Sequence, residues 1–376
     1  MLVHACIALV ALAQPAAQPE TRPESQASAL ILGTFTNDAV ALIDRGEAIA
    51  GDARLSIIHE HYAYQFATPE SRAAFLENPA KYEIQLGGAC ARMGALSGLG
   101  STSIYRVHEG RLYIFASEQC RGTFERHPDR VLEKLSPDEA PTGTPEQAAR
   151  GLELLDAAVE WLGGDEALNA LGAVEYRTEE DVDSRGKSYR QIDRTVIGPD
   201  GEMRTDYTWN EQYWMQLTSD EGSYFVDHAT GARPMHPQQH AAMTRKAARQ
   251  IPTVLRARNE PGFVAIASGR REDSPGETVL THINGVTTEL IIDADTGRLA
   301  GMRLEEWGPD HLLGTVERRF TSYDKLNGFK LPATWESWVD GVHAEALDRS
   351  TPTPARVLGE LPLGYFTSGT RPIVGG

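Results

Sequence analysis

The sequence repeats one segment, and this repeat constrains the fold more than any other feature. Residues 59–79 and 108–128 align at a constant offset of 49, with identical residues at eight of the 21 aligned positions. Each copy predicts a strand whose tyrosine and phenylalanine share one face, then an N-cap at Thr68 or Ser117 and a short helix that ends before a proline. Two such units can bury their aromatic side chains against each other, whereas one unit alone could not. The repeat therefore predicts a small module of two strand–helix units.

Three segments within and around the repeat carry a family resemblance. They are NDAVALIDRGEAIAG at residues 37–51, YEIQLGGACA at residues 82–91 and GRLYIFASEQC at residues 110–120. Through these motifs the chain resembles the YHS domain family over roughly residues 30–135, and we place this domain at residues 27–135. The resemblance implies a small treble-clef-like module whose cysteines bind a metal. Ala116 departs from the pattern, because metal-handling members often have a cysteine there.

The resemblance makes Cys90, Cys120 and Met93 candidate metal ligands. Thiolates with a thioether form the kind of set that binds Cu(I), whereas Zn(II) usually takes four nitrogen or sulfur ligands. His59 and His61 lie on one side of the predicted strand and form a second candidate pair for copper or zinc. A solvated turn is the alternative for these two histidines.

The two cysteines of the module also allow other arrangements. Cys90 and Cys120 can form a disulfide in an oxidising compartment, or remain as two inert buried thiols. They can also form a redox pair, in which case one thiol should be exposed and have a lowered pKa. The sequence leaves these alternatives open.

The second part of the chain begins with a linker and two helices. Residues 136–149 predict the linker and a helix start, in which Thr144 is the N-cap and Gln147 closes a capping box. One apolar stripe follows, made of Leu152, Leu155, Val159 and Leu162. A pair of glycines then ends this helix, and residues 165–171 predict a second short one.

Beyond residue 173 the apolar period changes to two, which predicts strands. Asn327-Gly328 is a strong hairpin signal, and a helix is expected near residues 238–251. We therefore predict an α+β fold, in which residues 150–376 form a curved antiparallel half-barrel with helices packed on it.

Three segments of this second domain resemble the LolA/LolB-like family of periplasmic lipoprotein carriers. They read GLELLDAAVEWLGGDEALNAL, IIDADTGRLAGMRLEEW and FTSYDKLNGFKLPATWESWVDG. The resemblance implies an apolar cavity for acyl chains, and so a lipid or lipoprotein as partner. Eight aromatic residues are candidates for its lining, with core packing as the alternative. They are Trp209, Tyr213, Trp214, Tyr224, Phe225, Trp307, Trp335 and Trp338.

The first 26 residues predict a signal peptide and a leader without a packed core. An apolar run at residues 2–13 precedes a stretch rich in proline, glutamine and glutamate. No later apolar run reaches the about 18 residues of a membrane-spanning helix. The sequence therefore predicts a periplasmic or secreted protein without a transmembrane segment.

Charge and motifs narrow the class of function. The net charge of −17 argues against non-specific binding of nucleic acid, and the motifs of serine hydrolases, P-loop and dinucleotide enzymes and zinc proteases are missing. We predict an exported, non-catalytic binding protein of two domains. The alternatives are a thiol- or metal-dependent redox protein that uses Cys90 and Cys120, and a purely structural interaction module.

Overall fold

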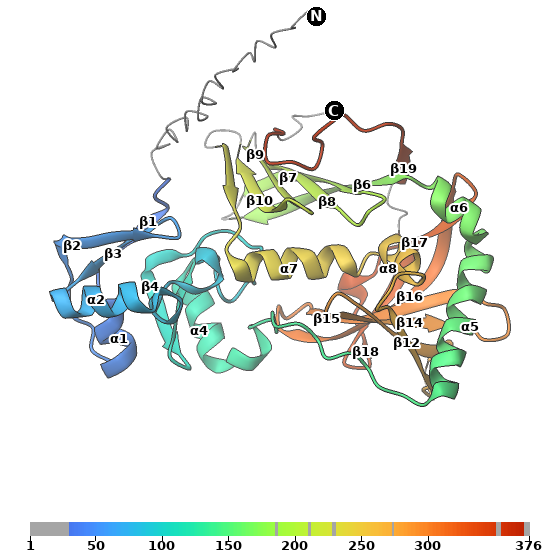
Figure 1. Cartoon of the computed structure of the whole chain (residues 1–376), viewed down its shortest axis with the longest axis horizontal. Coiled ribbons are helices and arrows are strands. Elements are labelled where there is room, and N and C mark those ends of the chain that lie inside the picture. Colours follow the sequence, from blue (N-terminus) through green and yellow to red (C-terminus); the bar gives the residue numbers. More distant parts are fainter. Residues whose placement is uncertain are drawn as a thin grey trace, which may run out of the picture. The chain divides into compact units, whose positions relative to one another are not determined.

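The structure is a computed structural model of the chain, and it describes residues 30–184, 187–209, 212–227, 231–272, 274–350 and 355–371 (Figure 1). Ile31–Gly376 form one compact unit. The predicted signal peptide and leader, residues 1–26, lie outside the described residues. Within the described residues, no helix is long and apolar enough to cross a membrane.

The strand–helix unit occurs twice, and each copy begins with a further strand. The first copy contains β2 (Asp52–His59), β3 (Tyr62–Phe66) and α2 (Pro69–Glu77). The second copy contains β4 (Ser101–His108), β5 (Arg111–Phe115) and α4 (Glu118–Arg126). Every boundary of the second copy lies 49 residues after its counterpart in the first. The assignment of this pair to the YHS family stays a prediction.

The two copies agree in local geometry as well. The turn residues Glu60 and Glu109 have φ angles of 45° and 48°. Thr68 and Ser117 are the N-caps, and each side chain accepts a hydrogen bond from the backbone three residues on. The predicted caps are thus confirmed.

The aromatic cores of the two copies are separate. The rings of Tyr64, Phe66 and Phe75 belong to one cluster, and their counterparts Tyr113, Phe115 and Phe124 belong to another. The expectation that the rings bury against each other is therefore wrong. Strand β5 is buried on both faces instead: its Leu112 and Ile114 pack in the first cluster, because alternate side chains point to opposite sides.

Short elements complete the N-terminal part. They are β1 (Gly33–Phe35), α1 (Ala39–Arg45), α3 (Pro79–Tyr82) and the 3-10 helices Gln85–Gly88 and Pro128–Arg130. Strand β1 pairs in parallel with β3, so that β1, β3 and β2 form a three-stranded sheet, while β4 and β5 form a hairpin.

The second part is α+β, as predicted, but its described strands form two sheets instead of one. The first sheet contains β6 (Ala173–Ser184), β7 (Lys187–Ile197), β8 (Met203–Trp209), β9 (Gln212–Ser219), β10 (Gly222–Asp227), β11 (Gly231–Pro234) and β19 (Ala355–Leu358). The second contains β12 (Val264–Arg270), β13 (Glu277–Ile283), β14 (Val286–Ile292), β15 (Leu299–Trp307), β16 (Leu313–Leu326), β17 (Phe329–Val339) and β18 (Val342–His343). A short 3-10 helix, Glu345–Leu347, follows β18.

Two helices separate the sheets. They are α7 (Pro237–Ala248) and α8 (Ile251–Ala257), which lie where the sequence predicts a helix near residues 238–251. Because they stand between β11 and β12, these strands become edges and do not pair with each other. Figure 1 shows α7 running alongside β9 and β10, which it contacts.

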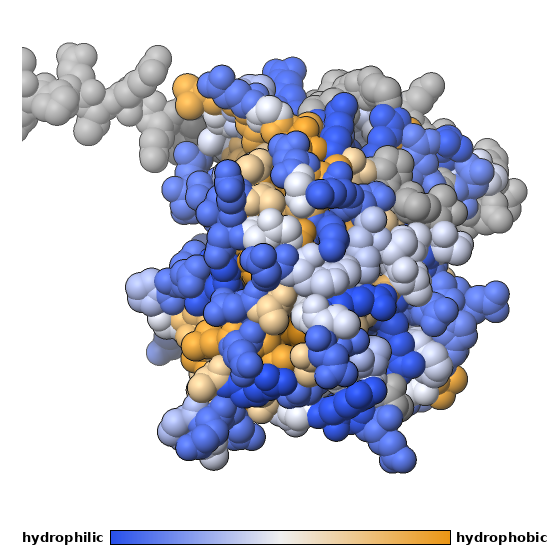
Figure 2. All heavy atoms as spheres, turned by 90° about the vertical axis from the view of Figure 1, so that its right-hand side faces the viewer, coloured by the Kyte–Doolittle hydropathy of each residue, from blue (hydrophilic) through white to orange (hydrophobic). Residues whose placement is uncertain are grey.

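Helix α5 (Pro145–Leu162) covers the second sheet, and α6 (Gly164–Ala170) follows it. Its capping box between Thr144 and Gln147 is formed as predicted. The predicted stripe is wrong at Leu152, which is 44% exposed, whereas Leu154 is buried. Leu154 stands four residues before the buried Ala158, so the two share the buried face of the helix. The face of the protein that carries α5 is mostly hydrophilic, with smaller apolar areas between the polar side chains (Figure 2).

Candidate functional site

A cavity of about 590 Å³ lies among the two sheets, helices α7 and α8, and the N-terminal part. The N-terminal part contributes Met93, Leu96, Ser97 and Glu133 to its wall. The lining is apolar over much of its area, and it includes Met203, Ile251, Met302, Leu304, Trp307, Phe320 and Trp335. Sites for small organic ligands are typically apolar clefts of roughly 300–1,000 Å³ with a few polar groups, and this cavity fits that description.

The polar part of the lining is predominantly cationic. Five basic side chains line the cavity against three carboxylates, although the whole chain carries a net charge of −17. The basic residues are Arg245, Lys246, Arg249, Arg318 and Arg349, and the acidic ones are Glu133, Glu305 and Glu306. The cavity is thus more positive than its surroundings, which favours an anionic ligand.

Several of these charges are already paired within the protein. Arg245 binds both carboxylate oxygens of Asp138, at 3.0 and 2.8 Å. Arg318 forms an ion pair with Glu306. The guanidinium groups of Arg318 and Arg349 also lie over the ring of Trp335, at 5.4 and 4.9 Å from its centroid.

Arg249 and Trp307 differ from these paired residues. Among the described residues, no carboxylate lies within ion-pair distance of Arg249, whose contact is a 3.5 Å hydrogen bond to the backbone oxygen of Glu305. The Nε atom of Arg249 and the Nε1 atom of Trp307 are both buried, and neither has a hydrogen-bond partner in the described part of the chain. Burial lowers the pKa of Arg249, and the nearby Arg245 lowers it further. The guanidinium of Arg249 also carries N–H donors on its two terminal nitrogens, so this lining residue can donate to an anion in the cavity.

Glu133 is the carboxylate that the N-terminal part contributes. Burial raises its pKa to about 6, although a hydrogen bond from the backbone of Ala95 and the charges of Arg249 and Arg245 act to lower it. The carboxylate of Glu305 adds to the rise. Glu133 therefore changes its charge close to neutral pH, unlike an ordinary glutamate.

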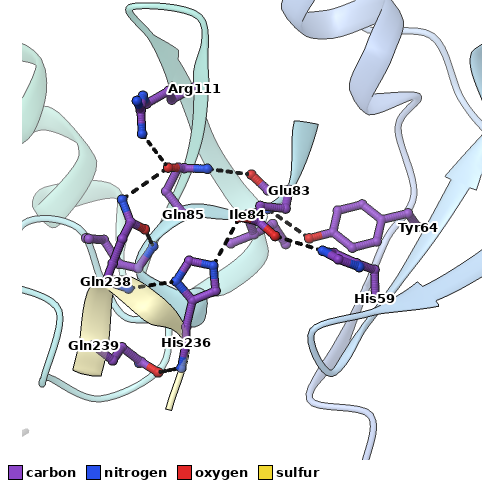
Figure 3. A network of polar contacts seen from close by, with 10 residues as sticks. His59, Tyr64, Glu83, Ile84, Gln85, Arg111, His236, Gln238 and Gln239 are labelled. Atoms are coloured by element: carbon purple, nitrogen blue, oxygen red, sulfur yellow. Dashed lines mark hydrogen bonds and ion pairs between the residues drawn. The ribbon is translucent and has the colours of Figure 1, made fainter. Parts of the chain in front are cut away.

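A second polar site joins the N-terminal part to α7 (Figure 3). The carboxylate of Glu83 lies between two imidazoles, 2.7 Å from His59 Nε2 and 3.1 Å from His236 Nε2. His236 is the N-cap of α7, so the carboxylate sits near the positive end of that helix. Burial alone would raise the pKa of Glu83, but the hydrogen bonds of His236 and His59 outweigh it and lower the pKa.

Hydrogen bonds to the backbone also hold the N-terminal part against α7. Gln238 Oε1 accepts a 2.6 Å hydrogen bond from the backbone of Leu86, and Gln239 donates one of 3.2 Å to the backbone oxygen of Ala95. A side chain at Gly87 would collide with Gln239 and His236. Gly87 therefore lets the N-terminal part approach α7 closely.

The predicted metal ligands are placed as follows. Cys90 and Cys120 are free thiols in one apolar cluster, in which Cys90 is fully buried. Burial raises the pKa of Cys90, the opposite of what a reactive redox thiol requires. Met93 is 48% exposed and lines the cavity, and His59 binds Glu83.

Among the described residues, no group of three or more His, Cys, Asp or Glu side chains is arranged to hold a metal. The turn residue His61 has a φ angle of 69°, and Gly110 takes its place in the second copy with a φ of 71°. The copper or zinc site stays a prediction.

Of the eight predicted cavity aromatics, Trp307 and Trp335 line the cavity. The others lie elsewhere. Trp214 stacks on Tyr207, Trp209 packs edge-on to Tyr189, and Tyr213 pairs with Thr208 across the first sheet. Tyr224 packs on a small cluster of that sheet, and Arg233 lies over the ring of Phe225. Trp338 lies under Arg319.

The residues of the two sites that the sequence does not predict include Glu83, Glu133, His236 and Arg249. His236 stands four residues before His240, a spacing that would place two side chains on one face of a helix. In the structure, however, these histidines have different partners: His236 binds Glu83 and His240 binds Ser223 at 2.8 Å. Glu83 and His236 lie 153 residues apart, so no local pattern could join them.

Comparison with known proteins shows distant structural similarity only. No family model matches the chain, and no curated protein matches it by sequence. A DUF1329 family protein from Desulfovibrio piger ATCC 29098 is 9% identical, with a TM-score of 0.35 over 58% of this chain and 97% of the other. A domain described as an outer membrane lipoprotein-sorting protein domain, from Vibrio parahaemolyticus, is also 9% identical, with a TM-score of 0.34 over 58% and 97%. At this level of similarity neither protein establishes a shared function.

Proposed function

We propose that this chain is an exported binding protein that holds the acyl chain of a lipid or lipoprotein in the cavity between its two sheets. The observation that carries the proposal is the lining, in which methionine, leucine, isoleucine and aromatic side chains surround about 590 Å³. Burying an acyl chain there removes its apolar surface from water, which stabilises the complex by about 0.8 kcal/mol for each methylene buried. A binding role needs no catalytic group.

The lining also fits a ligand of variable length. Met93, Met203 and Met302 come from three different parts of the chain and meet in this wall. Methionine side chains are unbranched and adapt to irregular partners, so they suit a flexible apolar ligand. The two tryptophans add large, stiff surfaces on which such a ligand can pack.

Binding of a fluorescent long-chain alcohol tests the proposal. Binding to the purified chain should saturate as the concentration of the alcohol rises. Leu304→Trp, which fills part of the cavity, should weaken this binding at least tenfold. Leu152→Trp is the matched control, because Leu152 is exposed on α5 and lies away from the lining. Equal binding by both variants, or no saturable binding by the unaltered chain, would contradict the proposal.

A copper or zinc site at Cys90 and Cys120 remains a separate proposal. It predicts bound metal near one equivalent in the purified protein, lost in Cys90→Ser and in Cys120→Ser. Metal content that does not respond to either substitution would rule it out.

A further inference from the structure

The polar part of the cavity lining has a positive charge that a site for an acyl chain alone does not need. Among the described residues Arg249 has no carboxylate within ion-pair distance, and the cavity wall carries a formal excess of two positive charges. A partly buried guanidinium without an ion-pair partner is stabilised by an anion, with which it forms charge-assisted hydrogen bonds. The anionic oxygens of a carboxylate, a phosphate or a sulfonate can accept these hydrogen bonds.

Glu133 lines the same cavity as Arg249, and the charges of Arg249 and Arg245 act on its carboxylate. It comes from the N-terminal part, whereas Arg245 and Arg249 come from α7 and its C-cap, and Glu305 from β15. Lys246, Glu306, Arg318 and Arg349 are the other charged residues of the wall. When Glu133 is ionised, it neutralises part of the field of Arg249 and Arg245.

We infer that the cavity takes a lipid with one anionic head group, and that this head replaces the charge of Glu133 beside Arg249, so that Glu133 takes up a proton as the lipid binds. The inference rests on the proposed function, since it names the class of lipid and the residue that regulates its binding. Two anions beside one half-buried arginine repel each other, and protonation of Glu133 removes that repulsion. The proton comes from solvent, and no covalent bond changes.

A definite pH dependence follows. Because the free protein has a Glu133 pKa of about 6, Glu133 is already protonated below that pH and proton uptake costs nothing there. Above it, each pH unit weakens binding of the anionic lipid by up to about tenfold. Binding of an uncharged lipid should show no such change, because it leaves the charge of Glu133 unaltered.

The test uses three probes whose charge does not change between pH 5.5 and 8: dodecanesulfonate, dodecanol and methanesulfonate. Calorimetry with the full chain should show dodecanesulfonate binding about tenfold more tightly at pH 6 than at pH 7.5, and dodecanol binding equally at both. Methanesulfonate has the head without the chain, so it should bind at least a hundredfold more weakly. If it binds as well as dodecanesulfonate, the site serves a free anion and the lipid inference is wrong.

Three substitutions assign the pH dependence and the preference for the sulfonate to individual residues. Glu133→Gln should bind dodecanesulfonate equally tightly at both pH values, and Glu306→Gln, at a lining carboxylate already paired with Arg318, should retain the pH dependence. Arg249→Gln should lose the preference for the sulfonate and still bind dodecanol, which also shows that the variant is folded. A pH dependence that survives in Glu133→Gln overturns the inference and leaves the proposed function standing. If neither dodecanol nor dodecanesulfonate binds, the proposed function falls and the inference with it.

Discussion

At the residue scale, the carboxylate of Glu83 links the N-terminal part to α7. It is 8% exposed and accepts hydrogen bonds from His59 and His236 in different parts of the fold. A buried carboxylate with two such donors is stable as an anion, whereas removal of the charge leaves two buried N–H groups with a weaker acceptor.

Glu83→Gln should therefore destabilise the protein by about 1.5–3 kcal/mol at pH 7. The folded-state pKa of Glu83 is lowered, so its contribution is present above the unfolded pKa near 4.5 and is lost as the pH falls through the lower folded value. Urea unfolding at pH 7 and pH 3.5 measures this, and the difference between variant and unaltered chain should shrink at the lower pH. Glu60→Gln, at an exposed turn, is the control and should change stability by less than about 0.5 kcal/mol. A difference for Glu83→Gln that does not vary with pH would contradict this assignment.

The two thiols of the N-terminal part should differ in reactivity. Cys90 is fully buried, its Sγ accepts a 3.2 Å hydrogen bond from the backbone of Ala116, and its pKa is raised by burial. Cys120 is only partly buried. In a Cys6→Ser background, a thiol reagent should modify Cys120 in the folded protein and Cys90 only after unfolding. Cys120→Ser and Cys90→Ser variants assign the two phases, and rapid native labelling of Cys90 would disprove the expected order.

At the element scale, the buried face of α5 follows from its contacts with the second sheet. Leu154 is 2% exposed in the core cluster, and Gly151 lies so close to β12 that an added Cβ would be 2.8 Å from the backbone oxygen of Ala265. Leu154→Ala should cost about 2–5 kcal/mol of unfolding free energy. Leu152→Ala, two residues earlier and exposed, is its matched control and should cost less than about 1 kcal/mol. Comparable losses in the two variants would show that the helix presents a different face.

Local elements could be predicted from sequence to the extent that their signals lie within a few residues. The caps at Thr68, Ser117 and Thr144 and the turn at Asn327-Gly328 are examples, because a cap or hairpin is formed by neighbours in the chain. The division into two sheets could not be predicted in this way. The separation follows from the helices α7 and α8 that stand between β11 and β12, and not from the residue pattern of either strand.

The candidate site was less predictable for the same physical reason. Trp307 and Trp335 were expected in a cavity, but so were six aromatics that pack elsewhere, since an aromatic in a strand looks the same on either face. Glu133 precedes the predicted linker and has no sequence signal of its own. Burial raises its pKa, and the charges that act on it, those of Arg245, Arg249 and Glu305, come from residues more than 100 positions away.

At the scale of the whole molecule, the N-terminal part forms a wall of the cavity as well as a module of its own. Further hydrogen bonds join this part to the rest of the chain in addition to the contacts of Glu83. Gln216 donates one of 2.9 Å to the backbone oxygen of Leu96, and Arg130 donates one of 3.0 Å to the backbone oxygen of Leu313. A side chain at Gly94 would collide with the ring of Trp307. The division into domains at residues 27–135 and 150–376 stays a prediction, and these contacts determine how it can be tested.

Cleavage of the chain between residues 140 and 144 is the sharpest such test. The contacts through Glu83, Gln238 and Gln216, with the Arg245–Asp138 ion pair at 2.8 Å, all join one side of the cut to the other. The two pieces should therefore co-elute in size-exclusion chromatography and melt in one transition, because neither the cavity wall nor the start of α7 is complete without the partner piece. With His236→Ala and Gln238→Ala together, the cut chain should separate at micromolar concentration while the uncut variant still folds. Pieces that separate without these substitutions would mean that the N-terminal part is an independent domain, and the cavity would then need no contribution from it.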